Sequence, residues 1–261
     1  MSSKQLGEGE RSIQSVARAL HILKYIGAHG NSAGLTAISA GVELSNSTTH
    51  GLLATLKKNG FVQQEEDQGK YSLGISLFEL GQTVKQDMNV QKISLPYLKI
   101  LVEKYNETMH LGILAQHEIV YIEKVESLRS IRMLSQVGGR HPAYCTGIGK
   151  VLLAELSDTT VQEFFKEREL LRFTQTTITD LNELLCHLAR IRVEGHAFDE
   201  EEIEAGLRCV AVPLKNYKNC GVAAISMCIP VNRLAKHDLA EIIRDLKVAA
   251  LEISRKLGYL N

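Results

Sequence analysis

The chain has 261 residues, is 44% hydrophobic and 23% charged, and carries no net formal charge, which fits a globular protein of one large domain or two ordinary ones. No apolar run approaches the roughly 18 residues that cross a bilayer, and the polar start MSSKQLGEGERS predicts no secretory signal. The balanced charge argues against a protein that coats nucleic acid without regard to sequence.

The N-terminal part of the chain predicts a helix-turn-helix. Residues 12–28 have apolar side chains at helical spacing, and Ser15 can cap this first helix. A short apolar segment, 35–42, leads through a glycine-bearing turn to a helix with a polar leading end, SNSTTH. Two short helices in this order are the pattern that places a recognition helix in the major groove of DNA.

The polar leading end has two readings. Small hydroxyl and amide side chains there can reach base edges and phosphates. The predicted DNA-binding residues are therefore Ser45, Asn46, Ser47, Thr48, Thr49 and His50. The alternative is that the cluster only caps a helix. A predicted hairpin, FVQQEEDQGKYSL, follows and favours the winged form of the motif. Residues 1–88 hold eight Lys/Arg and eight Asp/Glu, so DNA binding would gain from the doubled contacts of a dimer.

The rest of the chain predicts a connecting helix and a second domain. The helix over 74–88 has an apolar surface too broad for a solvated linker, so we expect it to pack on a partner or on the head. Beyond it, strand-like runs at 108–115, 118–125, 130–135, 196–198, 207–214 and 221–229 alternate with helical segments at 93–105, 150–156, 158–165, 179–194 and 238–256. A mixed sheet flanked by helices is an α+β fold. The predicted domains are 12–74, a winged helix-turn-helix; 75–90, the connecting helix; and 91–261, the α+β domain.

A ligand pocket is expected around the stretch GGRHPAYCTGIGK, residues 138–150. It predicts a glycine-rich loop and a helix that starts near Gly149, whose free N–H groups suit a carboxylate or phosphate. Asp199 opens the acidic run 199–202, which joins two strand-like segments, and it can turn inward to accept hydrogen bonds from ligand hydroxyls. The alternative is a solvated acidic face.

Two arginines flank the glycine loop. For Arg140 we expect a surface ion pair with the acidic run. For Arg132 both that ion pair and a bond to a ligand carboxylate stay open.

The sequence marks no catalytic or metal site. His141 and Cys145 are four residues apart, which suits a thiol with a base, or a zinc site that uses Cys145, Cys209 or His141. The sequence marks no third residue that would complete a catalytic or metal site, and a lone cysteine beside small residues is usually inert. Five scattered cysteines without a CxxC pair indicate reduced thiols in a cytoplasm. We therefore expect no catalytic residue, metal or cofactor.

Four stretches resemble the IclR family of bacterial transcriptional regulators, and the resemblance covers nearly the whole chain. They are LSNSTTHGLLATLKKNGFV in the head and GGRHPAYCTGIGKVLLAEL, AFDEEEIEAGLRCVAVPL and VAAISMCIP in the second domain. Their order and spacing together are highly specific. The stretches HLGILAQHEIVYIEKVESLRSIRMLSQVG and EISRKLGY look most like the pectin-degradation regulators of that family, which respond to 2-keto-3-deoxygluconate.

The resemblance implies a linker helix used in dimerisation, a GAF-like effector-binding domain, and dimers or tetramers on palindromic DNA operators. It also implies a small carboxylate effector in a pocket made of Gly147, Ile148, Asp199, Leu207, Cys209 and Ser226, to which Arg132 is a candidate addition. Family heads often carry basic residues where this chain has Asn46 and Gly51. Two expectations follow: either operator affinity is modest, or operator binding relies more on the wing residues Lys70 and Tyr71.

The sequence thus predicts a cytoplasmic, sequence-specific DNA-binding regulator, expected to repress, whose operator affinity is controlled by a small carboxylate, such as a keto sugar acid. The alternative is an enzyme that binds or processes keto acids and carries an incidental helical head. That alternative predicts turnover and no protected DNA, and no recognisable nucleophile–base or metal set supports it.

Overall fold

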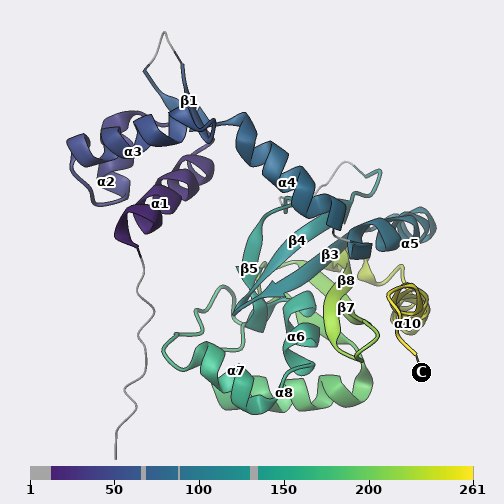
Figure 1. Ribbon diagram of the computed structural model, residues 1–261. Coiled ribbons are helices and arrows are strands. Elements are labelled where there is room, and N and C mark those ends of the chain that lie inside the picture. The colour runs from purple at the N-terminus through teal and green to yellow at the C-terminus, as the bar shows by residue number, and fades with distance from the viewer. Residues whose placement is uncertain (1–12, 66–68, 88, 130–134, 261) are drawn as a thin grey trace, which may run out of the picture. The chain divides into compact units, whose positions relative to one another are not determined.

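A computed structural model describes residues 13–65, 69–87, 89–129 and 135–260, and the chain divides after residue 87 into two compact units (Figure 1). The first unit contains α1 Gln14–Ala28, α2 Leu35–Gly41, α3 Asn46–Lys58, β1 Val62–Gln64, β2 Tyr71–Leu73 and α4 Ile75–Asp87. Strands β1 and β2 form an antiparallel hairpin. Fully buried Ile22, Ile26, Ile38 and Leu53 join the three helices into one core. The predicted winged helix-turn-helix order is therefore present.

The start of α1 differs from the prediction. Residue Ile13 occupies the N-cap position, and no side chain caps the helix. The assignment of Ser15 as cap was wrong because the helix already begins at Gln14, which leaves Ser15 inside the first turn.

The second unit is a six-stranded sheet between two layers of helices, so the predicted α+β class is confirmed. The expectation of a mixed sheet was wrong, because all its described strand pairs are antiparallel. The strand order is β5-β4-β3-β8-β7-β6. The strands are β3 Thr108–Ala115, β4 Glu118–Val125, β5 Arg140–Pro142, β6 Ala197–Glu200, β7 Leu207–Lys215 and β8 Gly221–Pro230. The helices are α5 Asn89–Tyr105, α6 Gly147–Ala154, α7 Asp158–Phe165, α8 Leu181–Glu194, α9 Val231–Leu234 and α10 Leu239–Lys256.

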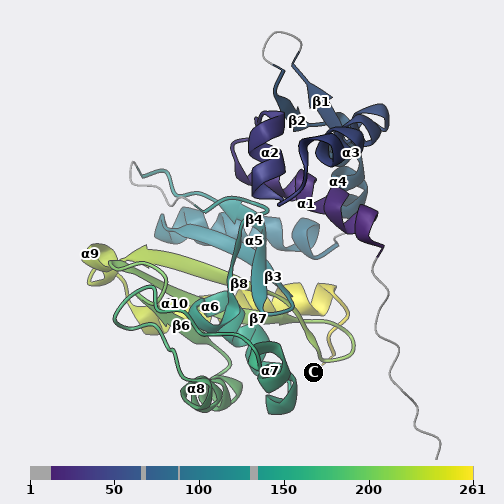
Figure 2. The ribbon, with the colours of Figure 1, turned by 90° about the vertical axis from the view of Figure 1, so that its left-hand side faces the viewer.

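Side-chain alternation builds a separate core on each face of this sheet. On β7, Val210 and Val212 pack in the core formed with α5 and α10, whereas Ala211 packs in the core formed with α6 and α8. Figure 1 shows α6 and α10 on opposite sides of β7 and β8, and Figure 2 views the unit from the α6 side. The polar side chains of interest lie on the α6 face.

Three segments depart from the predicted elements. The glycine stretch is more ordered than a loop: β5 is followed by a 3-10 turn, Ala143–Cys145, and α6 begins at Gly147 rather than near Gly149. Strand β6 extends to Glu200, so Asp199 lies in a strand and not in a connection. The strand expected at 130–135 lies outside the described residues except for Ser135. Within the described part of the chain, no helix is both long and apolar enough to cross a membrane.

Candidate functional site

The leading end of α3 presents a row of small polar side chains. The hydroxyl of Ser45 caps the helix, accepting a hydrogen bond from the N–H of Thr48 at 3.3 Å and contacting the Ser47 hydroxyl at 3.1 Å. The side chains of Asn46 and His50 are exposed beside them. Ser45 therefore caps the helix while its neighbours stay exposed for contact with DNA. The two interpretations of this cluster, as a helix cap and as DNA-binding residues, do not exclude each other.

Two of the predicted DNA-binding residues are buried instead. The side chain of Thr49 is fully buried on the same helical face as Leu53, and its hydroxyl donates to the Ser45 carbonyl at 3.1 Å. Tyr71 is 5% exposed because its position in β2 points into the core of the head. Neither side chain can contact DNA in this conformation, whereas Lys70 is exposed on the wing.

The first unit also exposes apolar side chains on two helices. Those in and next to α1 and α4 are Ile13, Val16, Leu20, Ile75, Phe78 and Leu80, each more than half exposed. The three near α1 are spaced three and four residues apart, which places them on one helical face. Clustered exposed apolar side chains mark contact surfaces. The expectation that the helix over 74–88 packs on a partner or on the head stays a prediction.

A cavity of about 270 Å³ lies on the α6 face of the second unit. Its walls come from β4, β5, β6 and β7 and from the residue that caps α6; they include Tyr121, His141, Thr146, Asp199, Leu207 and Cys209. The lining within the described part of the chain contains no lysine or arginine. The polar side chains of the described lining are therefore hydrogen-bonding groups and carboxyl groups.

The cavity brings together part of the predicted ligand site. Three predicted residues line it, namely Asp199, Leu207 and Cys209. Three others are buried without being among the lining residues: Gly147 and Ile148 in the first turn of α6, and Ser226 on β8. Arg132 lies outside the described residues. The roles of all seven stay predictions.

Tyr121 was missed, although its strand was predicted. Its ring packs against His110, with ring centroids 4.7 Å apart, and against His141 at 5.5 Å. Alternation along β4 puts it on the same face as the buried Ile119. That alternation was the available signal, but it does not say that a cavity lies above the strand.

Asp199 is an acid of the cavity wall whose surroundings raise its pKa. Its side chain is 4% exposed, and its Oδ1 accepts a hydrogen bond from the backbone N–H of Glu202 at 2.8 Å. Burial, helped by the charge of Glu202, raises the pKa of Asp199 to about 7 even though that hydrogen bond lowers it. Near neutral pH the carboxyl group can therefore either donate or accept a hydrogen bond.

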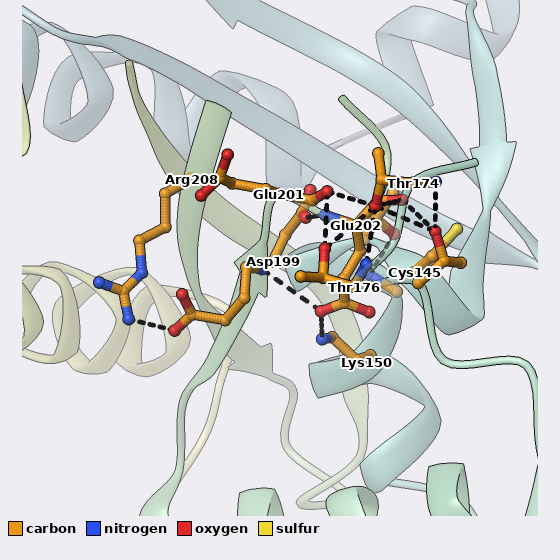
Figure 3. A network of polar contacts seen from close by, with 12 residues as sticks. Cys145, Lys150, Thr174, Thr176, Asp199, Glu201, Glu202 and Arg208 are labelled. Atoms are coloured by element: carbon orange, nitrogen blue, oxygen red, sulfur yellow. Dashed lines mark hydrogen bonds and ion pairs between the residues drawn. The ribbon is translucent and has the colours of Figure 1, made fainter. Parts of the chain in front are cut away.

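The rest of the acidic run is structural. Glu202 is 3% exposed and forms an ion pair with Lys150 of α6, whose side chain is equally buried (Figure 3). The hydroxyl of Thr177 donates to the Glu202 carbonyl at 2.7 Å, and that of Thr174 donates to the Glu201 carbonyl at the same distance. The solvated-face alternative is wrong for Asp199 and Glu202.

Arg140 forms a surface ion pair, but with a different partner from the one predicted. Its guanidinium lies 3.1 Å from Glu118, and its side chain is 55% exposed. Strands β4 and β5 pair and bring the two residues to the same sheet edge, whereas the acidic run begins in the last two residues of β6 at the opposite edge.

His141 and Cys145 do not form a nucleophile–base pair. Cys145 is fully buried, its Sγ lies 3.8 Å from the carbonyl of Pro142, and burial raises the pKa of its thiol well above the ordinary value. Burial and the nearby His110 lower the pKa of His141. No cluster of three or more His, Cys, Asp or Glu side chains suited to a metal ion is found among the described residues.

The glycines of the 138–150 stretch serve close packing. A Cβ at Gly149 would lie 2.1 Å from the carbonyl oxygen of Ala143, and one at Gly147 would lie 3.2 Å from the Cβ of Ala211 on β7. Gly147 therefore lets the start of α6 lie close to β7, and Gly149 lets the helix pack against the preceding 3-10 turn. Because Thr146 both caps α6 and lines the cavity, the start of this helix, where N–H groups lack intrahelical partners, borders the cavity.

Comparison with known proteins matches both units to one family. A family model described as the IclR helix-turn-helix domain matches residues 15–66, and one described as bacterial transcriptional regulator IclR C-terminal matches residues 82–255. The chain is 37% identical to the HTH-type transcriptional regulator KdgR of Escherichia coli K12, covering 99% of this chain and 98% of the relative.

Two further comparisons agree. The transcriptional repressor IclR of Escherichia coli K12 is 33% identical, covering 94% of this chain and 90% of the relative. The crystal structure of Thermotoga maritima IclR superposes with a TM-score of 0.74 at 33% identity, covering 95% of this chain and all of that one. These relatives are regulators, not enzymes. The chain is a DNA-binding transcriptional regulator that belongs to the IclR family and falls with its KdgR-like members.

Proposed function

We propose that this regulator represses transcription as a homodimer or homotetramer on a palindromic operator in the cytoplasm, and that a small carboxylate effector, a keto sugar acid, controls its operator affinity. The observation that carries the effector proposal is the cavity bordered by Asp199 and by the start of α6. A ligand acts only if it binds two arrangements of the protein with different affinity.

The cavity chemistry supports a hydroxylated acid. A ligand carboxylate is proposed to lie near the N-terminal end of α6, whose capping residue Thr146 lines the cavity, while Asp199 offers a carboxyl group to ligand hydroxyls. The hydroxyl of Thr146 is already engaged, accepting from the Gly149 N–H at 3.1 Å. The relative KdgR is similar in sequence over 98% of its length, and the pectin-degradation regulators that this chain resembles respond to 2-keto-3-deoxygluconate, so this is the first ligand to test.

The head is proposed to read DNA with the exposed side chains of α3. Operator fragments would first be selected from genomic DNA with the purified protein, and affinity then measured by fluorescence anisotropy. The double substitution Asn46→Ala/His50→Ala is expected to weaken operator binding at least tenfold, since each good base contact is worth about 1–3 kcal/mol. The control Gln162→Ala, an exposed amide on α7, should bind like wild type. Equal affinity for all three proteins would contradict this assignment.

Oligomerisation is proposed to cover the exposed apolar side chains of α1 and α4. Placing a charge in this surface, as in Val16→Asp/Phe78→Asp, is expected to dissociate the oligomer at micromolar concentration because the new carboxylates would be desolvated. Sedimentation velocity measures this directly. Leu128→Asp, at a 95% exposed position of the second unit, is the matched control and should leave the oligomer intact. An unchanged sedimentation coefficient for the double variant would rule out this surface.

Calorimetric titration with 2-keto-3-deoxygluconate tests the effector site. We expect micromolar binding by wild type, no detectable heat with Asp199→Ala, and unchanged binding by Glu163→Ala, an exposed carboxylate on α7. The same ligand should change operator affinity. Binding without any such change would refute the effector role, and no heat with wild type would redirect the search to other small acids.

A further inference from the structure

Two cysteines face each other across neighbouring strands of the sheet. Cys209 of β7 is paired in register with Cys228 of β8, and their sulfur atoms lie 2.7 Å apart. Opposed residues of antiparallel strands have Cα atoms about 4.5–5.5 Å apart, within the roughly 4.4–6.8 Å that a disulfide spans. A bond between them therefore needs only a small approach of the two sulfur atoms, to about 2.05 Å.

A histidine and a serine complete a row that begins and ends at the cavity. Nδ1 of His110 lies 3.6 Å from the sulfur of Cys228, and its Nε2 lies 2.7 Å from the hydroxyl of Ser135. Both Ser135 and Cys209 line the 270 Å³ cavity. The row Ser135–His110–Cys228–Cys209 thus places a thiol pair beside a histidine, with one sulfur in the cavity wall.

The two thiols are not equivalent. The hydrogen bond that Cys209 donates lowers the pKa of Cys228, and the nearby His110 lowers it further, although burial opposes both effects. The same hydrogen bond, together with burial, raises the pKa of Cys209. Cys228, which lies beside His110 and has the lowered pKa, is therefore the thiol of the pair better suited to react first, and Cys209 is placed to resolve an oxidised Cys228.

We propose that Cys209 and Cys228 are a redox-modification site that forms a reversible disulfide when a small hydroperoxide, such as hydrogen peroxide, enters the cavity. The Cys228 thiolate attacks one peroxide oxygen, the O–O bond breaks, and hydroxide leaves to give a sulfenic acid. The Cys209 sulfur then attacks the Cys228 sulfur; the S–S bond forms, the S–O bond breaks, and water leaves with the Cys209 proton. Two thiols are oxidised and one peroxide is reduced to water.

The disulfide has a consequence for the ligand, and this consequence rests on the proposed function. Forming the bond draws the sulfur of Cys209 towards β8 and removes its S–H from the cavity wall. Asp199 is the residue paired with Cys209 on the neighbouring strand, so the wall changes beside the proposed ligand acceptor. Oxidation is therefore expected to weaken effector binding at least tenfold.

The test uses full-length protein in which the two exposed cysteines are replaced, Cys186→Ser/Cys220→Ser, which leaves three of the five thiols. After brief hydrogen peroxide treatment and denaturation, titratable thiols should fall from three to one, and dithiothreitol should restore three. Peptide mapping should find the 209–228 crosslink, also in otherwise unsubstituted protein. The additional change Cys145→Ser should not prevent that crosslink, whereas Cys209→Ala should prevent it and leave a dimedone-reactive sulfenic acid at Cys228.

Three retained thiols, or a loss of thiols without the 209–228 crosslink, would overturn the disulfide. Titration of 2-keto-3-deoxygluconate into reduced and oxidised protein tests the coupling, and equal affinities would overturn it. If neither form binds this ligand, the proposed effector fails while the thiol count still decides the disulfide.

Discussion

Replacing Lys150 by methionine is expected to lower the free energy of unfolding by about 3–5 kcal/mol, the usual cost of removing one partner from a buried ion pair. Lys150 and Glu202 are 2% and 3% exposed and pair with each other. The second carboxylate oxygen of Glu202 has no hydrogen-bond partner within the described structure. Methionine fills a similar volume, so the loss comes from the unpaired carboxylate and not from a cavity.

Urea unfolding followed by circular dichroism at pH 7 measures this loss. Lys166→Met is the control, because it removes an exposed ion pair: the side chains of Lys166 and Glu163 are 66% and 73% exposed. This change should alter the free energy of unfolding by less than about 0.5 kcal/mol. Adding Glu202→Gln to Lys150→Met should recover much of the loss, because the buried charge is then gone. A cost below about 1 kcal/mol at pH 7 would contradict this role for the pair.

The ion pair shows where sequence reasoning reached its limit. The strands 108–115 and 118–125 were predicted to the residue because apolar periodicity and a local turn define them. Lys150 and Glu202 are 52 residues apart, and only the sheet topology brings α6 and the end of β6 together. No local pattern distinguishes a lysine that will be buried from one on a solvated helix face.

The same limit applies to where the predicted site residues lie in the structure. Asp199 was predicted to turn inward because it joins a strand-like segment, and the structure buries it in the cavity wall. Thr49 and Tyr71 were chosen by their position in a polar cluster and in a wing. Their burial depends on which face of α3 and of β2 packs against the core of the head. Tertiary packing decides this, and the composition of the segments does not reveal it.

Asp199→Asn is expected to increase stability at pH 8 by up to about 4 kcal/mol while changing it little at pH 4. The folded-state pKa of Asp199 is raised from 3.8 to about 7, and each pKa unit corresponds to about 1.36 kcal/mol. Between these values the folded protein holds a proton that the unfolded chain has released, so stability falls as pH rises through this window. Asparagine is neutral throughout and keeps an oxygen acceptor for the Glu202 N–H.

The measurement is the free energy of unfolding of wild type and variant at intervals from pH 4 to pH 8. Asp245→Asn supplies a control of opposite sign: hydrogen bonds from Lys104 and Tyr105 lower the pKa of Asp245, so this change should destabilise at pH 8. If the free energies of unfolding of wild type and Asp199→Asn changed with pH in the same way, burial of the Asp199 carboxylate would not destabilise the folded protein at high pH. If instead Asp199→Asn is more stable and binds the effector less tightly, then the carboxyl group is kept for the ligand at the expense of stability, as expected of a functional residue.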